Sequence, residues 1–263
     1  MDVKAKKHLG QHFLTSDKVA CDIVHAVKSD TFTKVIEVGP GMGILTKELI
    51  KIYGDALSVI DLDGESIKYL RKNFPELGDR IIEGDFLEMR LSDITDEKVA
   101  LVGNYPYNIS TQIMFKVYEN KDHIVECSGM FQKEVAARIA SGPGNKQYGV
   151  TSVLLQTWFD IEYLFTVGPE HFNPPPKVDS GIIRLLRNSR VELPFPDKFY
   201  KRVVKTAFGQ RRKTLRNGLK SMLNEFKVEL PEKYISQRPE QLGVEEFLEI
   251  TQMLYDAMLT SKK

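Results

Sequence analysis

Short apolar runs alternate with amphipathic stretches through the first half of the chain. The apolar, β-branched runs cover residues 34–38, 56–62, 80–85, 98–103 and 124–131, and we expect each to form a strand. Helical spacing of apolar residues follows at 44–53, around 65–73 and near 111–118. Because the apolar runs lack a regular polar face, they predict a mostly parallel sheet covered by helices on both sides. The fold class is therefore α/β, with doubly wound βα units.

The pattern changes after residue 147. Residues 148–159 have the spacing of a helix, and residues 161–167 and 181–186 have the composition of strands. These two strands flank a proline-rich connection, FNPPPKVDS (172–180), which predicts an antiparallel hairpin at the edge of the sheet.

A polar segment with two prolines, residues 187–198, interrupts this pattern and predicts a domain boundary. Beyond it we expect only helices, at about 198–208, 213–226 and 244–259. The chain thus divides into a large domain, 1–190, and a small all-helical domain, 191–263.

Polar or glycine residues stand where four predicted strands end. Gly39, Gly41 and Gly43 follow the first strand, and Asp61, Asp85 and Asn104 end the next three. A tight turn can use glycines without a ligand, and G-x-G-x-x-G is not matched because residue 44 is Ile. Each acid could also be an ordinary capping residue, and Asp63 is an alternative to Asp61. In a parallel sheet, however, neighbouring carboxyl ends face one crevice, so we expect a common pocket.

The residue types in this pocket predict a nucleoside ligand. Asp61 can accept hydrogen bonds from ribose hydroxyls, and Asp85 from an adenine amino group. The chain lacks the phosphate-binding pattern G-x-x-x-x-G-K-[ST]. A nucleoside without phosphates beside acidic residues such as Glu37 favours S-adenosylmethionine, whose sulfonium is a cation.

The segment GNYPYN (103–108) ends the fourth strand with an unusual set of residues. Asn and Pro are common in plain turns, and the two tyrosines could simply pack. The alternative is a site that grips a flat ring and hydrogen-bonds its edge.

Six motifs decide between these interpretations. EVGPGMGILT, GNYPYNIS, LGQHFL (9–14), QKEV (132–135), PPPKVDS (174–180) and QRRKTLR (210–216) occur in an order that resembles the ribosomal RNA adenine dimethyltransferase family. The resemblance covers nearly the whole chain and is greatest to the bacterial small-subunit branch. It implies a Rossmann-like class I methyltransferase domain and S-adenosylmethionine as methyl donor. It also implies a target of two adjacent adenines in a hairpin near the 3′ end of 16S rRNA, each dimethylated at N6.

The resemblance also implies roles for individual residues. Asn104, Pro106 and Tyr107 would be catalytic: the Asn104 amide oxygen and the Tyr105 carbonyl accept from the target amine, Pro106 stiffens the loop and Tyr107 stacks on the flipped base. The cofactor would be bound by His12, Leu14, Gly39, Gly41, Asp61, Asp85 and Asn104. Three positions depart from the family pattern, which usually has Glu at 61, often Asn at 12, and Leu or Ile at 105.

Charge is unevenly distributed along the chain. Residues 198–220 contain nine Lys or Arg and no acid, although the net charge of the chain is only +1. A solvated helix face is the ordinary explanation, but arginine suits phosphate, and we expect an RNA-binding surface. A second basic group comprises Lys4, Lys6 and Lys7. The candidate RNA-binding residues of the helical domain are Lys205, Arg211, Arg212, Lys213 and Arg216.

Other features limit the class of protein. The two cysteines, Cys21 and Cys127, form no metal or disulfide pattern, and no apolar run reaches the ~18 residues of a membrane span. We therefore expect a cytoplasmic, monomeric enzyme that needs no metal and has the small ribosomal subunit as its partner. Two alternatives stay open: a large-subunit rRNA or DNA adenine methyltransferase, and a ribosome-assembly factor that binds RNA without needing catalysis.

Overall fold

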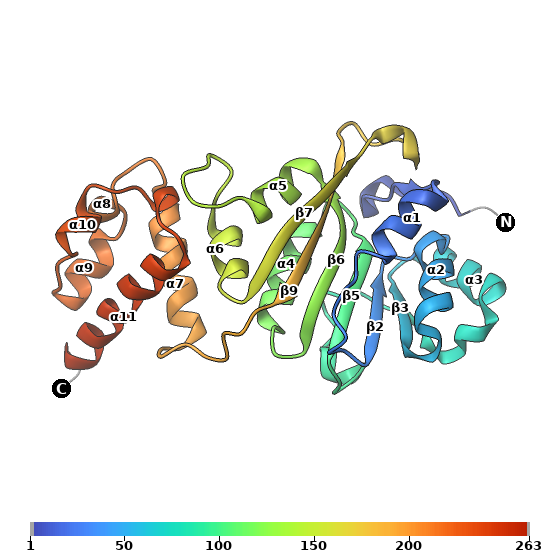
Figure 1. Ribbon diagram of the computed structural model, residues 1–263, viewed down its shortest axis with the longest axis horizontal. Helices are drawn as coiled ribbons and strands as arrows, with labels where there is room; N and C mark the ends of the chain where they lie inside the picture. Colours follow the sequence, from blue (N-terminus) through green and yellow to red (C-terminus); the bar gives the residue numbers. More distant parts are fainter. Residues whose placement is uncertain (1–2, 262–263) are drawn as a thin grey trace. The chain divides into compact units, whose positions relative to one another are not determined.

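The computed structural model describes residues 3–261 and contains a mixed seven-stranded sheet (Figure 1). The strand order is β4-β3-β2-β5-β6-β9-β7, and the first five of these strands run parallel. The strands are β2 (Lys34–Val38), β3 (Leu57–Asp61), β4 (Ile81–Glu83), β5 (Val99–Asn104), β6 (Ile124–Gln132), β7 (Phe159–Val167) and β9 (Ser180–Arg187). All five strands predicted for the parallel part are present, so the predicted α/β class is confirmed.

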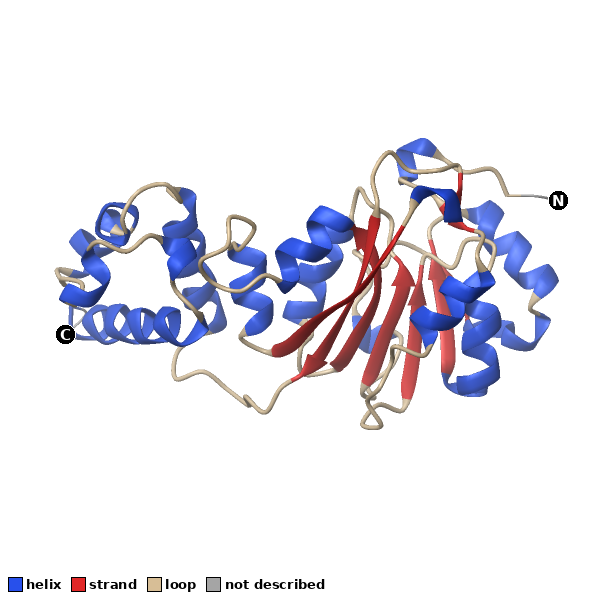
Figure 2. Ribbon diagram, turned by 45° about the horizontal axis from the view of Figure 1, so that its top comes forward, coloured by secondary structure: helices blue, strands red, loops and turns tan. Residues whose placement is uncertain are grey.

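Helices flank both faces of this sheet (Figure 2). They are α1 (Asp17–Val24), α2 (Ile44–Tyr53), α3 (Gly64–Asn73), α4 (Ser110–Glu119) and α5 (Lys133–Ala140). Buried apolar residues of α1, α2 and α3 form one cluster with the sheet, which includes Ile23, Leu49 and Leu70. Helices α1 and α5 were not predicted from the sequence. Short 3-10 helices occur at Lys7–Leu9, Gly54–Ala56, Pro75–Arg80, Leu91–Asp93, Pro169–His171 and Pro239–Gln241.

The predicted antiparallel hairpin is confirmed. Strand β9 pairs antiparallel with both β6 and β7, which leaves β7 at the edge of the sheet. The helix predicted at 148–159 is shorter than expected: α6 covers Val150–Gln156, and Phe159 already begins β7. Phe159 is buried whereas Asp160 is exposed, so this stretch follows the alternation of a strand.

The chain forms two compact units. One contains residues up to 137 together with 159–188, and the other contains 138–158 together with residues from 189 onward. The helices of the second unit are α6, α7 (Asp197–Gly209), α8 (Leu215–Gly218), α9 (Lys220–Phe226), α10 (Glu232–Ile235) and α11 (Val244–Ser261). The sequence-based division at residue 190 had left 138–158 in the first domain. These residues group with the helices because they pack on α7, where Thr157 Oγ1 lies 2.9 Å from the Tyr200 hydroxyl.

A buried tyrosine lies beneath the end of β5. Tyr105 has no exposed surface, and its hydroxyl lies 3.3 Å from Cys127 Sγ and 3.4 Å from the Ser128 carbonyl oxygen. Two glycines provide room for the ring: a Cβ on Gly129 would lie 2.6 Å from it, and a Cβ on Gly103 would lie 3.0 Å from it. Tyr105 is therefore a satisfied core residue that holds the segment following β5.

We expect Gly129→Ala to destabilise the first unit. The new methyl group would lie 2.2 Å from the Gly103 carbonyl oxygen, which belongs to the neighbouring strand and cannot move aside cheaply. Overpacking of this kind costs about 1–3 kcal/mol or more, which urea denaturation measures directly. Gly142→Ala is the matched control, since nothing lies within 4 Å of a Cβ at that position. Equal stability of the two variants would contradict this account of the packing.

Candidate functional site

A pocket opens where strands β2, β3, β4 and β5 end. It combines the turn after β2 and the ends of the other strands with the N-terminal segment, residues 9–13. Eight residues that the sequence analysis selected line it: His12, Gly39, Gly41, Asp61, Asp85, Asn104, Pro106 and Tyr107. The parallel topology thus brings together residues that lie as many as 95 positions apart.

The glycines after β2 allow other segments to approach closely. Gly39 and Gly41 both have positive φ, at 71° and 55°. A Cβ on Gly41 would lie 2.7 Å from the Phe13 ring, and one on Gly39 would lie 3.4 Å from Pro106. Side chains here would displace the N-terminal segment and crowd the loop after β5, so glycine is required by both conformation and space.

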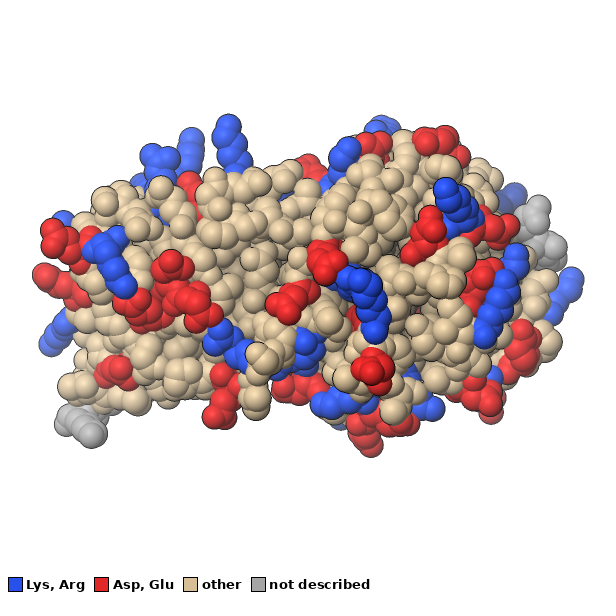
Figure 3. Space-filling view, viewed as in Figure 1, with Lys and Arg blue, Asp and Glu red and all other residues tan. Residues whose placement is uncertain are grey.

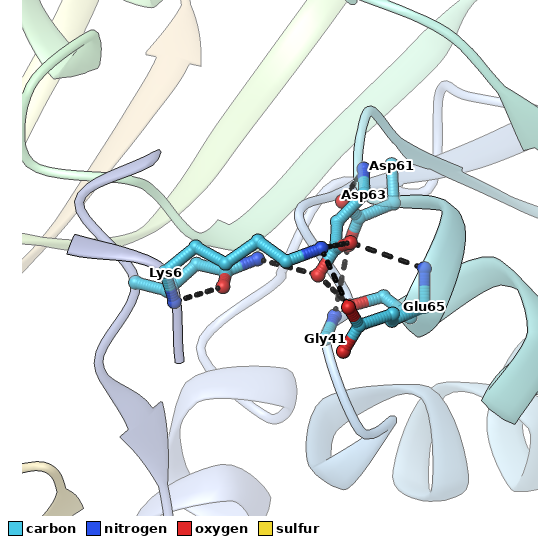
Figure 4. Close-up of polar contacts among 7 residues, drawn as sticks. Lys6, Gly41, Asp61, Asp63 and Glu65 are labelled. Carbon is cyan, nitrogen blue, oxygen red and sulfur yellow. Dashed lines mark hydrogen bonds and ion pairs between the residues drawn. The ribbon is translucent and has the colours of Figure 1, made fainter. Parts of the chain in front are cut away.

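Asp61, rather than Asp63, lines the pocket. Backbone N–H groups orient its carboxylate: Gly41 donates to Oδ2 at 3.2 Å and Asp63 to Oδ1 at 2.9 Å (Figure 4). Burial raises the pKa of Asp61, and these backbone hydrogen bonds oppose that shift. A carboxylate oxygen has two lone pairs, so both oxygens can still accept from a ribose.

Asp63 instead anchors the N-terminal segment. Its Oδ1 accepts from Lys6 Nζ at 2.5 Å and its Oδ2 from Gln11 Nε2 at 3.2 Å, as Figure 4 shows for Lys6. It also caps α3 through the backbone N–H of Glu65. Although burial opposes the shift, these hydrogen bonds lower the pKa of Asp63, those of Lys6 and Gln11 foremost. The Lys6 ammonium thus forms ion pairs with Asp63 and Glu65. Lys4 and Lys7, the other members of this basic group, are exposed.

The loop after β5 presents its acceptors to the pocket. Asn104 Nδ2 donates to the His12 carbonyl oxygen at 2.9 Å, which turns Oδ1 away from the N-terminal segment. Among residues 3–261 no hydrogen bond to this Oδ1 is seen. The backbone N–H of Tyr105 donates to the Met130 carbonyl oxygen at 3.2 Å and fixes the loop on β6.

Tyr107 contacts Ser180 through its hydroxyl group and His12 through its ring. The hydroxyl lies 2.5 Å from Ser180 Oγ, and burial raises the pKa of Tyr107. The ring centroid lies 5.3 Å from that of His12, whose Nδ1 is 2.8 Å from the Pro174 carbonyl oxygen. Ser180 and Gln11 were not singled out from the sequence, although both lie inside the motifs that define the resemblance.

Leu14 does not line this pocket. It is 3% exposed in β1 (Phe13–Leu14), which pairs antiparallel with β8 (Phe172–Asn173). It borders a smaller adjoining cavity together with Phe13 and Gly39. Leu14 thus differs from the other expected cofactor residues, since strand pairing turns its side chain into the core.

Glu37 also lies outside the set of lining residues. Its side chain is 1% exposed, and Thr46 Oγ1 donates to its Oε2 at 2.6 Å. Burial raises its pKa to about 8, and the nearby Asp61 charge acts in the same direction. Glu37 is therefore a buried group beneath the glycine turn.

The helical unit exposes most of its predicted RNA-binding residues. Lys205, Arg212, Lys213 and Arg216 are exposed, whereas Arg211 is half-buried and donates to the Asn145 carbonyl oxygen at 3.3 Å. Within the described part of the chain, Arg212, Lys213 and Arg216 have no acidic partner. Figure 3 shows one face of the molecule, on which basic and acidic side chains are interspersed.

The chain combines the sheet of a Rossmann-like methyltransferase with a pocket at the ends of its parallel strands. The family model for ribosomal RNA adenine dimethylase matches residues 2–256, and the chain belongs to that family, which confirms the resemblance drawn from the motifs. Ribosomal RNA small subunit methyltransferase A of Cytophaga hutchinsonii is 54% identical, over 96% of this chain and 98% of the relative. The protein of the same name from Bacteroides thetaiotaomicron is 53% identical, over 98% and 97%.

Two solved structures share the fold over most of the chain. A dimethyladenosine transferase from Plasmodium falciparum aligns with a TM-score of 0.78 at 22% identity, covering 94% of this chain and 98% of that one. The 23S rRNA methyltransferase ErmE aligns with a TM-score of 0.65 at 26% identity, covering 92% of this chain and 99% of that one.

Across residues 3–261, no helix is both long and apolar enough to cross a membrane. The same residues contain no group of three His, Cys, Asp or Glu that could hold a metal.

We expect Glu37 to make the stability of the ligand-free protein depend on pH. Its pKa rises from 4.5 to about 8 on folding, so the folded state favours the protonated form. The resulting loss of stability begins above pH 4.5, grows by up to about 1.4 kcal/mol per pH unit and levels off above pH 8. Glu37→Gln should therefore gain stability over the wild type progressively between about pH 5 and 8 in urea denaturation.

Glu83→Gln, an exposed change at the end of β4, is the control and should show no such gain. A constant difference between Glu37→Gln and the wild type across this range would mean that Glu37 does not titrate there.

Proposed function

We propose that this protein transfers methyl groups from S-adenosylmethionine to the N6 amines of two adjacent adenines near the 3′ end of 16S rRNA. The observation that carries the proposal is the convergence of Asp61, Asp85 and Asn104–Tyr107 on one pocket. Relatives more than 50% identical are named as small-subunit methyltransferases, which favours this substrate over large-subunit RNA or DNA. We further propose that the protein acts in the cytoplasm, on the small ribosomal subunit, and as a monomer.

The hydrogen-bond acceptors of the pocket fit the donor groups of S-adenosylmethionine. Asp61 is oriented by two backbone N–H groups to accept the ribose hydroxyls. Asp85 has its Oδ1 engaged by the backbone N–H of Leu87 at 2.8 Å, so its Oδ2 is available for the adenine amino group. The ligand supplies an activated methyl group, and these residues bind and orient it.

The loop after β5 would act on the target amine. The amine is a poor nucleophile because its lone pair is delocalised into the ring. Hydrogen bonds from its N–H groups to Asn104 Oδ1 and the Tyr105 carbonyl oxygen would favour a pyramidal nitrogen. The contact of Asn104 with His12 holds Oδ1 in place before the substrate arrives. Tyr107, held by Ser180, supplies a face on which the extruded base stacks.

The basic residues of the helical unit are proposed to bind RNA phosphates. A shallow groove there is lined by Lys213 and Lys220 together with amide and hydroxyl side chains, Gln210, Asn217, Ser221 and Asn224. Arg212 and Arg216 are exposed next to it in sequence and can bind phosphate through two parallel hydrogen bonds.

Methyl transfer to ribosomal substrates tests the function. Labelled S-adenosylmethionine would be offered with small subunits that lack the modification, and with naked 16S rRNA, large subunits and duplex DNA. We expect about four methyl groups per small subunit, mapped to adjacent adenines. Transfer to large subunits or DNA instead would favour the alternative methyltransferases.

Tyr107→Ala is the control for the chemistry in this assay. It should bind S-adenosylmethionine like the wild type and transfer little methyl, because the base loses its stacking face. If the wild type binds cofactor and RNA but transfers to none of the substrates, the assembly-factor hypothesis becomes the better one.

We expect Arg212→Ala combined with Arg216→Ala to weaken binding of small-subunit RNA in a salt-dependent manner. The slope of log K against log salt is negative, and loss of two phosphate contacts should make it shallower by about 1.4–1.8. Lys68→Ala with Lys72→Ala removes two exposed charges from α3 and is the matched control. Equal slopes for the two double variants would mean that residues 198–220 form an ordinary solvated helix face and do not bind RNA phosphates.

A further inference from the structure

A lysine on α4 holds the turn that carries Asp85. Lys116 lies on α4, and its Nζ donates to the Leu87 carbonyl oxygen at 3.0 Å and to the Met89 carbonyl oxygen. The same ammonium lies 5.0 Å from the centroid of the Phe86 ring. One cation thus contacts Phe86, Leu87 and Met89 in the segment that follows β4.

That segment is a compact turn built on Asp85. The backbone N–H groups of Glu88 and Met89 donate to the Asp85 carbonyl oxygen at 3.0 and 3.1 Å, and that of Leu87 donates to Oδ1 at 2.8 Å. Asp85 and Phe86 both line the pocket, and Phe86 is only 3% exposed. A shift of this turn would therefore move the Asp85 carboxylate and the Phe86 ring together.

We propose that Lys116 is a positioning residue for the adenine end of the nucleoside, because its ammonium fixes the turn that presents Asp85. The inference rests on the proposed function, which places adenine beside Asp85. Lys116 does not line the pocket itself, so it acts only through the turn.

The Lys116 ammonium is a donor that the Leu87 and Met89 carbonyl oxygens share. Without it, the carbonyls of Leu87 and Met89 would lose their shared donor, and their dipoles would face the same space. Burial, the largest effect, lowers the pKa of Lys116, whereas the negative charges of Asp85, Glu88 and Glu119 favour its charged form. The cation therefore bridges two backbone carbonyls in a half-buried site, where hydrogen bonds from a charged donor are strong.

Lys116 also connects the proposed adenine-binding turn to the proposed catalytic segment. Its helix, α4, begins at Ser110, after the short loop that contains Tyr107 and connects α4 to Asn104, the last residue of β5. Ser110 Oγ donates to the Tyr107 carbonyl oxygen at 3.1 Å, which ties the start of α4 to that loop. The lysine thus fastens the adenine-binding turn to the helix that continues from the proposed catalytic segment.

A binding cycle between Lys116 and the amino group of the ligand tests the inference. S-adenosylhomocysteine and S-inosylhomocysteine differ at purine position 6, where inosine lacks the amine that Asp85 would accept from. We expect Lys116→Met to weaken S-adenosylhomocysteine about tenfold and S-inosylhomocysteine less than about twofold, measured by calorimetry. Lys116→Arg, which keeps a cationic donor, should remain within about threefold of the wild type.

Kinetics separate positioning from chemistry. For Lys116→Met we expect the KM for S-adenosylmethionine to rise by a similar factor, with kcat at saturation within about twofold of the wild type. Lys72→Met, which removes an exposed ammonium from α3, is the control and should match the wild type in every measurement. If Lys116→Met does not fold, Lys116→Gln takes its place with the same expected values.

Two results would overturn the inference. An equal loss of affinity for both ligands would mean that Lys116 supports the fold in general, and no loss for either would mean that the turn does not need it. Failure of the wild type to bind S-adenosylhomocysteine would be a different outcome, because it would contradict the proposed function itself.

Discussion

The parallel pairing of β3, β2 and β5 is the constraint on which the site depends. Val38 lies opposite Ile60, and Glu37 lies opposite Val102, so the three strands end at one edge of the sheet. The residues after these strands then necessarily face a common space. A shift in strand pairing would separate Asp61 from Asn104, whatever their individual conformations.

A second layer of interactions converts this edge into a shaped pocket. Asp63 binds Lys6 and Gln11, and Asn104 binds the His12 carbonyl oxygen, so the N-terminal segment is attached at several points. Lys6 and Asp63 act only by positioning this segment, because neither lines the pocket. Glu37 and Asp61 are both buried, and this burial raises the pKa of each carboxyl group. Hydrogen bonds to a ligand are stronger in such surroundings than at an open surface.

Tyr105 illustrates how a departure from the family pattern is accommodated. Its phenol ring stands where an aliphatic side chain was expected. Because the ring is fully buried, its hydroxyl group needs hydrogen-bond partners. Cys127 and Ser128 provide them, while Gly103 and Gly129 leave space for the larger ring. Phe131 completes the surroundings with a ring centroid 4.8 Å away. The backbone of Tyr105 is held on β6, where its N–H donates to the Met130 carbonyl oxygen.

The sequence alone determined the order of the strands in the chain, the glycine turn and the acids and amide at the strand ends. These features are local, because apolar periodicity and turn composition depend on neighbouring residues. The motifs added the family and with it the chemistry. Tertiary structure decided what local patterns could not: that Asp61 and not Asp63 lines the pocket, that Leu14 is buried in β1, and that residues 138–158 join the helical unit. It also revealed Lys116 beneath the Asp85 turn, 31 positions away in sequence. Contacts between distant segments depend on how helices and strands pack, and no local pattern of residues records them.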